Sequence, residues 1–171
     1  MKRDTIMSGT AAALSHMTEA DQTKFCLWLQ SDELRSLIDD SRVPGLEDQM
    51  QWFKRVQQPD RKFFSLITVP DGTLIGNCGF VDIDPAHQEA TLRITIGNPD
   101  YRGKGLGTEA VSLLVHYGFE SMSLKRILLK VLATNTRAIR TYEKAGFLPS
   151  SEEVKEGKTI VTMSLMKPSR T

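Results

Sequence analysis

A glycine-rich segment, Tyr101-Arg-Gly-Lys-Gly-Leu-Gly-Thr108, constrains the fold of this chain more than any other feature. It follows a strand-like run at residues 90–97 and precedes an amphipathic helical run at residues 106–120. Three glycines in five positions allow a tight turn with exposed main-chain N–H groups, and the helix start adds unpaired donors and a positive dipole end. Arg102 and Lys104 add two cations. The segment therefore predicts a strand–turn–helix unit that binds an anion, and a pyrophosphate fits best.

Other phosphate-binding loops fit this segment less well. It is not a P-loop, because no Gly-Lys-Ser/Thr sequence ends it. Counted from Gly103, the third glycine is Gly107, one position too early for the Gly-x-Gly-x-x-Gly pattern of dinucleotide-binding folds. An acidic ribose ligand at the usual distance is also missing. On the glycines alone, a strand–helix connection without a ligand stays open.

Hydrophobic periodicity and turn residues divide the chain into strands and helices. Thr18 is a good N-cap for a first helix, and Pro59 ends a second helix that follows Pro44. The expected elements, after a loose lead-in at residues 1–9, are a strand at 10–15, the two helices, strands at 63–69, 74–83 and 90–97, a helix at 106–120, a strand at 126–132, a helix at 136–145, and strands at 147–148 and 159–165. This order predicts an α/β fold with a mixed sheet and helices on both faces.

Composition and charge narrow the class of protein. A length of 171 residues favours a single domain over residues 1–171. The net charge of +1 excludes a strong global field, so we expect neither a nucleic acid nor a membrane as partner. The chain lacks a secretory signal pattern and an apolar run that could span a bilayer, which favours a cytoplasmic location. Cys26 and Cys78 lack metal-site or redox spacing, so we expect buried thiols and no metal.

A second patterned segment begins 33 positions after Arg102 and reads Asn135-Thr-Arg-Ala138-Ile-Arg-Thr-Tyr142-Glu-Lys-Ala-Gly146-Phe147. Together the two segments resemble the Arg/Gln-x-x-Gly-x-Gly/Ala motif and the Asn-x-x-Ala-x-x-x-Tyr-x-Lys-x-Gly-Phe helix of the GNAT superfamily of N-acetyltransferases. The resemblance is close over residues 62–148. The local sequence is most similar to the branch that contains ribosomal-protein, polyamine and amino-sugar acetyltransferases.

The resemblance implies a mostly antiparallel sheet of about six to seven strands, acetyl-CoA as co-substrate, and direct transfer in a ternary complex. In the family, the strand before the loop splays from the next parallel strand, and the pantetheine arm of the co-substrate fills the gap. The implied co-substrate residues are Thr95, Ile96 and Gly97 on the arm, Arg102, Gly103, Lys104, Gly105, Leu106, Gly107 and Thr108 on the pyrophosphate, and Asn135 and Ala138 beside the arm.

Tyr142 matches the family tyrosine that protonates the departing thiolate, although a core aromatic residue is the alternative. The general base stays open, because many relatives place a glutamate where this chain has Leu92. Nearby titratable residues are Asp82, Asp84, His87 and Glu89, of which Glu89 is our candidate base beside a chain of waters. His16 and His116 lack partners at ligand spacing.

The preferred function is acetylation of a primary amine on a small molecule of the polyamine, amino-sugar or aminoglycoside type. One alternative is acetylation of a protein α-amine, and an alternative of another class is a non-catalytic acyl-CoA-binding module. The acceptor side falls in residues 18–60 and 80–90, where Trp28 and Trp52 are expected in the core or in a pocket wall. The oligomeric state, including a homodimer, stays open.

Overall fold

The computed structural model describes residues 3–37 and 46–169, with the side chains of 36, 37 and 46–50 left out. Its elements are β1 (Thr5–Ser8), β2 (Ala12–Ser15), α1 (Glu19–Trp28), α2 (Asp32–Leu37), α3 (Leu46–Arg55), β3 (Lys62–Thr68), β4 (Leu74–Asp84), β5 (Glu89–Ile96), α4 (Leu106–His116), β6 (Arg126–Leu132), α5 (Thr136–Lys144), β7 (Leu148–Lys155) and β8 (Lys158–Met166). The predicted α/β fold with a mixed sheet is confirmed.

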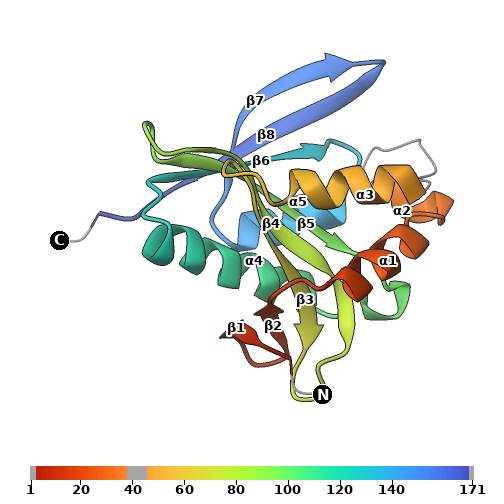
Figure 1. Ribbon diagram of the computed structural model, residues 1–171. Coiled ribbons are helices and arrows are strands. Elements are labelled where there is room, and N and C mark those ends of the chain that lie inside the picture. Colours follow the sequence, from red (N-terminus) through yellow and green to blue (C-terminus); the bar gives the residue numbers. More distant parts are fainter. Residues whose placement is uncertain (1–2, 38–45, 170–171) are drawn as a thin grey trace.

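The strands form one eight-stranded sheet in the order β1-β2-β3-β4-β5-β6-β8-β7. Every neighbouring pair is antiparallel except β5 and β6, which are parallel. Helices α1 to α3 lie on one face of the sheet, and α4 and α5 lie on the other (Figure 1). This arrangement follows from the crossovers, because parallel strands such as β5 and β6 need a helix to connect them.

The main core lies between the sheet and α4. Ala110, Val111 and Leu114 of α4 are fully buried and belong to one cluster with Phe64 and Phe80 of the sheet. On the opposite face, an aromatic row joins helix to strand. The ring of Trp52 in α3 lies 5.7 Å from that of Phe63 and 6.2 Å from that of Phe25 in α1. The sheet is therefore packed on both faces.

The N-terminal segment departs from the prediction of a loose lead-in. Residues 5–8 form β1, which pairs with β2. The loop between the two strands is held by Glu109 of α4, whose carboxylate accepts hydrogen bonds from the N–H groups of Thr10 and Ala11. Arg3 forms an ion pair with Asp21 at 2.6 Å. A four-residue edge strand carries too few apolar residues for a period-2 signal, which explains the error.

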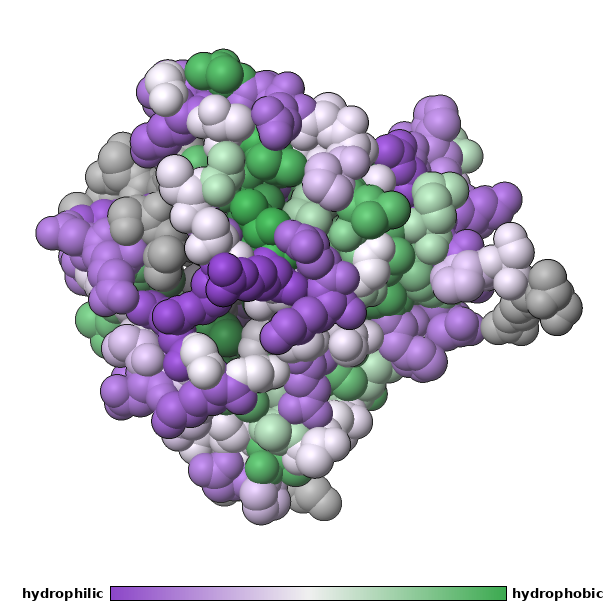
Figure 2. Space-filling view, turned by 180° about the vertical axis from the view of Figure 1, so that it is seen from behind, coloured by the Kyte–Doolittle hydropathy of each residue, from purple (hydrophilic) through white to green (hydrophobic). Residues whose placement is uncertain are grey.

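The C-terminal hairpin is also longer than predicted. We expected a strand at 147–148, but β7 runs from Leu148 to Lys155, and every one of its residues is exposed. Without a buried face, β7 has no alternation of apolar and polar residues. The β7–β8 hairpin projects beyond the body of the molecule (Figure 1). From the side of α4 and α5, apolar side chains reach the surface in patches among polar ones (Figure 2).

The helices agree with the predicted runs apart from their ends. Thr18 caps α1 as predicted, in a reciprocal capping box with Asp21. Helix α4 ends at His116 and continues as a wider π-helical turn over Tyr117–Ser121. The short α2 was not predicted. Pro44 and the side chains of Leu46 and Met50, which belong to the predicted second helix, lie outside the described residues.

Candidate active site

The parallel strands β5 and β6 separate part of the way along their length. Their pairing runs only from Glu89 opposite Arg126 to Thr91 opposite Leu128, whereas β5 continues to Ile96. Beyond Thr91 the two strands therefore enclose a gap in the sheet. This is the splay that the sequence resemblance implied.

The hydrogen bonds between β4 and β5 determine which main-chain groups of β5 face this gap. Gly97 N–H donates to the carbonyl of Ile75 at 2.9 Å, and Thr95 lies opposite Asn77. Hydrogen-bonded positions alternate along an antiparallel pair, so the N–H groups of Thr95 and Gly97 are directed at β4 and that of Ile96 at the gap. Of the three residues expected on the pantetheine arm, Ile96 presents its N–H on the side of the gap, whereas the N–H groups of Thr95 and Gly97 are turned towards β4.

The loop that follows β5 has the main-chain geometry of an anion site. Gly103 and Gly105 have φ values of +74° and +81°, which favour glycine, and Gly105 is the N-cap of α4. The N–H groups of residues 103–108 donate no hydrogen bond to any residue in the described part of the chain. A Cβ added at Gly105 would meet nothing within 4 Å. A run of unpaired donors thus faces open space at a helix N-terminus.

The two cations of the loop differ in their surroundings. Arg102 turns back onto β5: its Nε donates to the carbonyl of Ile96 at 2.9 Å, and its Nη2 donates to the carbonyl of Gly97 at 3.1 Å. Its Nη1 lies 3.6 Å from Glu33 of α2, and the side chain is 11% exposed. Lys104 is exposed and lies over the ring of Tyr101. Arg102 therefore joins the loop to the end of β5, whereas Lys104 presents its charge at the surface.

A tryptophan packs against the end of β5. A Cβ at Gly97 would come within 2.2 Å of Trp28 Cε3, so the indole occupies the space that a side chain would need. Phe25 lies beside this indole, with ring centroids 5.9 Å apart. The prediction that Trp28 lies in the core or a pocket wall agrees with this contact, and it explains why position 97 is a glycine.

Helix α5 aligns three of the predicted residues along one face. Asn135 is its N-cap, and the Asn135 Oδ1 atom accepts a hydrogen bond from Ala138 N–H at 3.2 Å. Tyr142 follows at seven positions from Asn135, and this spacing places all three on one stripe of the helix. The N-cap bond leaves the side-chain NH₂ of Asn135 without an acceptor among the described residues.

Tyr142 is buried, with 8% of its surface exposed, and its ring packs edge-on to Phe147 with centroids 6.1 Å apart. Burial raises the pKa of Tyr142 to about 12. The hydroxyl is therefore protonated at neutral pH. Within the described part of the chain it has no hydrogen-bond acceptor, so it is available as a proton donor.

The structure does not bring Glu89 to the gap. Glu89 lies where β5 and β6 are still paired, and its carboxylate forms an ion pair with Arg126 at 3.2 Å. Leu92, at the position of the family glutamate, is buried in the core. Asp84 and His87 form an exposed pair at 2.7 Å in the β4–β5 turn. The geometry therefore gives no support to Glu89 as general base.

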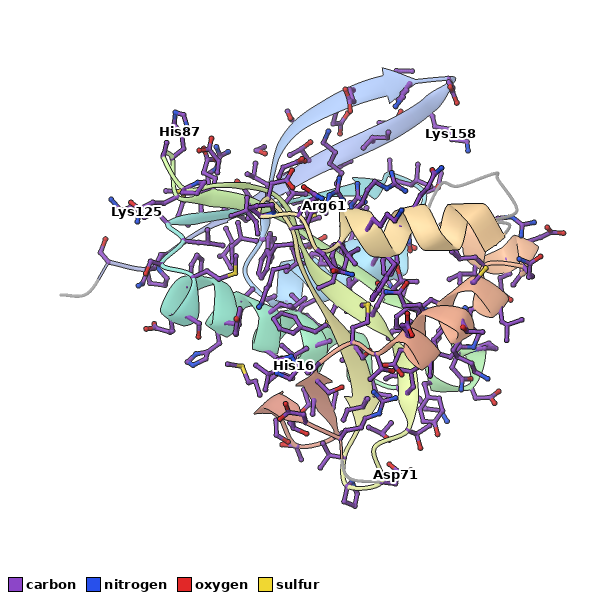
Figure 3. The ribbon with its side chains drawn as sticks, in the orientation of Figure 1. His16, Arg61, Asp71, His87, Lys125 and Lys158 are labelled. Atoms are coloured by element: carbon purple, nitrogen blue, oxygen red, sulfur yellow. The ribbon has the colours of Figure 1, made fainter. Side chains whose placement is uncertain are left out.

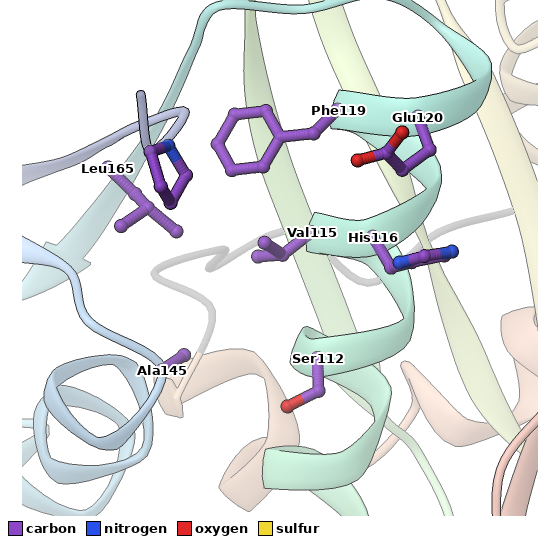
Figure 4. Close-up of a pocket in the computed structure, with 8 residues that line it drawn as sticks. Ser112, Val115, His116, Phe119, Glu120, Ala145 and Leu165 are labelled. Carbon is purple, nitrogen blue, oxygen red and sulfur yellow. The ribbon is translucent and has the colours of Figure 1, made fainter. Parts of the chain in front are cut away.

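A surface pocket of about 310 Å³ lies away from the loop (Figure 4). It lies at the C-terminal ends of α4 and α5, whereas Gly105 marks the N-terminal end of α4. Its lining comprises Ser112, Val115, His116, Phe119, Glu120, Ala145, Leu165 and Pro168. It is therefore separate from the gap between β5 and β6.

Metal sites and membrane spans are two further classes of feature that bear on function. In residues 3–37 and 46–169, no three His, Cys, Asp or Glu side chains are grouped to hold a metal ion. Within the same residues, no helix has the length and apolar character needed to cross a bilayer. Burial raises the pKa of the Cys78 thiol well above its ordinary value, as expected for an inert core cysteine.

A family model and two curated relatives that match this chain all represent acetyltransferases. Residues 13–148 match the family model described as an acetyltransferase (GNAT) domain. The chain is 36% identical over 99 residues to the spermidine N(1)-acetyltransferase of Escherichia coli (strain K12), covering 58% of this chain and 51% of the relative. It is 37% identical over 97 residues to an uncharacterized N-acetyltransferase, p20, of Bacillus licheniformis, covering 54% of each. The chain thus spans about half the length of the curated relatives it matches.

Solved structures share the fold. Spermidine N-acetyltransferase from Vibrio cholerae, in complex with CoA and spermine, superposes with a TM-score of 0.83 at 19% identity, covering 91% of this chain and 95% of that one. A GNAT-family acetyltransferase from Bacillus anthracis superposes with a TM-score of 0.79 at 20% identity, covering 94% and 97%. At these identities the comparison supports the fold alone.

Proposed function

Because this chain belongs to the GNAT acetyltransferase family, we propose that it transfers the acetyl group of acetyl-CoA directly to a primary amine of a small molecule. The observation that carries the proposal is the gap between β5 and β6, which opens beside a loop of unpaired N–H groups at residues 103–108. The whole chain, residues 1–171, acts as one catalytic domain in this proposal.

The loop, the end of β5 and the start of α5 offer groups that would bind the pyrophosphate and the pantetheine arm of acetyl-CoA. The N–H groups of residues 103–108 and the charge of Lys104 would bind the pyrophosphate. The N–H of Ile96 and the side-chain amide of Asn135 would bind the arm in the gap, and the small side chain of Ala138 would leave room for it. Arg102 would contribute indirectly, by holding the loop against the end of β5, because its guanidinium donates hydrogen bonds to the carbonyls of Ile96 and Gly97.

Tyr142 supplies the proton in this mechanism. The amine attacks the thioester carbonyl carbon, the C–N bond forms, and the C–S bond breaks. The departing sulfur takes the proton of the Tyr142 hydroxyl, which the pKa of about 12 keeps in place. The proton lost by the amine passes to water, and Tyr142 is reprotonated from solvent. Water takes the role of base because Glu89 is paired with Arg126.

The acceptor proposed here is a polyamine, amino sugar or aminoglycoside, and the spermidine acetyltransferases among the relatives support an amine of this size. The test is thiol release from acetyl-CoA by the purified protein with a panel of such amines and with peptides bearing a free α-amine. Amine-dependent thiol release with a small molecule is the expected result. Release with peptides alone would favour the protein-acetylating alternative. CoA binding without any release would favour the acyl-CoA-binding module.

A further inference from the structure

Three arginines converge on the sheet face that carries α1 to α3. Phe63, Gly79 and Arg93 form one row across β3, β4 and β5, because Phe63 pairs with Gly79 and Gly79 with Arg93. Arg61 directly precedes β3, and its charge acts on Arg93. Arg55 ends α3, which packs on this face through the ring of Trp52 against Phe63. Figure 3 shows Arg61 beside the end of α3.

Gly79 lies between Phe63 and Arg93 in this row and carries no side chain. A Cβ at this position would come within 2.1 Å of the Lys62 carbonyl oxygen, so the backbone requires glycine. No side chain therefore stands between Phe63 and Arg93 in the row. The row has an aromatic wall at β3, an open centre at β4 and a guanidinium at β5.

Among the side chains that the structure describes, which do not include those of residues 36–50, Arg55, Arg61 and Arg93 form no hydrogen bond and no ion pair. Partial burial and then the charge of Arg61 lower the pKa of Arg93; Asp82 raises it, and Arg55 lowers it by less than Asp82 raises it. By contrast, carboxylates pair with Arg3, Arg35, Arg102 and Arg126. Of the described side chains, Asp82 is the one carboxylate that acts on Arg93 alongside the two other arginines, so the three like charges exceed it and a bound anion would neutralise the excess.

The cluster lies beside the reaction centre and away from the pyrophosphate loop. Thr91 is the last residue of β5 that pairs with β6, and Arg93 follows it on the same face. At about 3.3 Å per residue, Arg93 is about 7 Å beyond the start of the gap. From Arg93 the strand continues for three residues, about 10 Å, to Ile96, and the pyrophosphate loop follows beyond that end. The anion expected at the arginines is therefore a different group from the pyrophosphate.

We propose that the amine acceptor carries an anionic group, a phosphate or a carboxylate, and that Arg55, Arg61 and Arg93 bind this group while the amine reaches the gap. This inference rests on the proposed function and narrows it. Guanidinium groups match both oxyanions with paired hydrogen bonds. The cluster repels a polyamine, whose charge is positive along its whole length. Amino-sugar phosphates and amino acids fit the site, and simple polyamines do not.

The test is calorimetric binding to the protein–CoA complex of matched pairs that differ only in the anion: glucosamine 6-phosphate against glucosamine, and β-alanine against β-alaninamide. The first pair tests a phosphate and the second a carboxylate. In at least one pair we expect the anionic member to bind about ten- to hundredfold more tightly, the range for charge-assisted hydrogen bonds. Thiol release with the same amines should follow the same order in kcat/KM, with spermidine below the anionic member.

The variants Arg93→Gln and Arg61→Gln should each remove most of the difference within the pair and leave the KM of acetyl-CoA unchanged. The control is Lys125→Gln, which removes one exposed charge far from Arg61 (Figure 3) and should keep the difference. Melting curves identify any variant that fails to fold. Two independent arginines keep the test decisive if one of them does.

Glucose 6-phosphate separates this inference from the proposed function, because it carries the anion but no amine. If no amine releases thiol and glucose 6-phosphate or β-alanine still binds in a manner that depends on Arg93, the acetyltransferase proposal fails and the anion site stands. The anion site is overturned if neither anionic member binds more tightly than its neutral partner. It is also overturned if both arginine variants keep the full difference.

Discussion

At the scale of single residues, the proposal that Tyr142 donates a proton can be tested directly. Tyr142→Phe should lower kcat by about 10²- to 10⁴-fold, the range for general acid catalysis, and leave the KM of acetyl-CoA nearly unchanged. The ring that packs on Phe147 is retained, so the melting temperature should not fall. Because the raised pKa of about 12 keeps the hydroxyl protonated below that value, the rate should show no loss from Tyr142 ionisation up to about pH 10. Steady-state kinetics that give an unchanged kcat with chemistry rate-limiting would assign the proton to another group.

Gly105 offers a second test at this scale, with a matched control. Gly105 and Gly157 both have φ near +80°, at +81° and +76°, and neither Cβ position meets an atom within 4 Å. Valine at either position should cost about 1–2 kcal/mol of stability for the left-handed backbone. Only Gly105→Val should also weaken acetyl-CoA binding, by roughly tenfold or more, because its side chain would stand where the pyrophosphate is expected. Equal affinities of the two variants in calorimetry would contradict the proposed loop.

At the scale of elements, Arg102 connects three of them: the loop before α4, the end of β5, and α2 through Glu33. Arg102→Ala leaves two carbonyls without their donor, which should cost about 1.5–3 kcal/mol of stability. It should also raise the KM of acetyl-CoA on the order of tenfold, because the loop loses its anchor. Arg126→Ala removes a more exposed ion pair and should cost at most about 1 kcal/mol. A melting curve for Arg102→Ala that matches wild type would show that the hydrogen bonds of Arg102 do not stabilise the fold.

Asp21 joins the N-terminal segment, α1 and β3. Burial alone would raise the pKa of Asp21, but hydrogen bonds from Arg3, Ser65 and Thr18 N–H together lower it. A lowered folded-state pKa stabilises the fold above the ordinary value of 3.8, and this contribution is lost as the pH falls through the folded-state pKa. Asp21→Asn should therefore cost about 1–3 kcal/mol at pH 7, with a smaller difference below about pH 4.

Denaturation of Asp21→Asn at several pH values checks this prediction. Asp4→Asn is the control, since Asp4 is 83% exposed and should have little effect at any pH. A cost for Asp21→Asn that stays constant down to pH 3 would show that the carboxylate charge is not what stabilises this junction.

At the scale of the whole molecule, the co-substrate should act as a clamp across the sheet. The proposed site draws on β5, the loop before α4, and α5, which are joined only in part by β-sheet pairing. A ligand at 100 times its Kd adds about 2.7 kcal/mol to the free energy of unfolding, or roughly 5–11 °C in Tm for a protein of this size. A thermal scan with and without CoA measures this shift. An excess of EDTA should change neither Tm nor the rate, and a loss restored by a divalent ion would refute the metal-free mechanism.

The sequence located the parts of the site that depend on local chemistry. The loop glycines need positive φ and open space, and Asn135, Ala138 and Tyr142 share a helix stripe, so spacing places these residues, while the resemblance to the family supplies their proposed roles. The row of Phe63, Gly79 and Arg93 depends on strand register, which places residues from three strands side by side. No pattern within a short stretch of sequence predicts a cluster that is assembled from three strands. For the same reason Arg102 was expected to face a phosphate, and its carbonyl partners appear only once β5 and the loop are folded together.

The carboxylate of Glu109 couples two distant segments of the chain. It lies in the first turn of α4, beside the loop proposed to hold a pyrophosphate, and its charge is taken up by the N–H groups of Thr10 and Ala11. If the β1–β2 hairpin detached, the carboxylate of Glu109 would lose these hydrogen bonds and leave an unpaired negative charge beside the proposed pyrophosphate site. Thermodynamic reciprocity then requires that an anion in the loop tightens the hairpin by as much free energy as the hairpin tightens the anion. The β1–β2 hairpin, which contributes no residue to the proposed reaction, should therefore contribute to the affinity for acetyl-CoA.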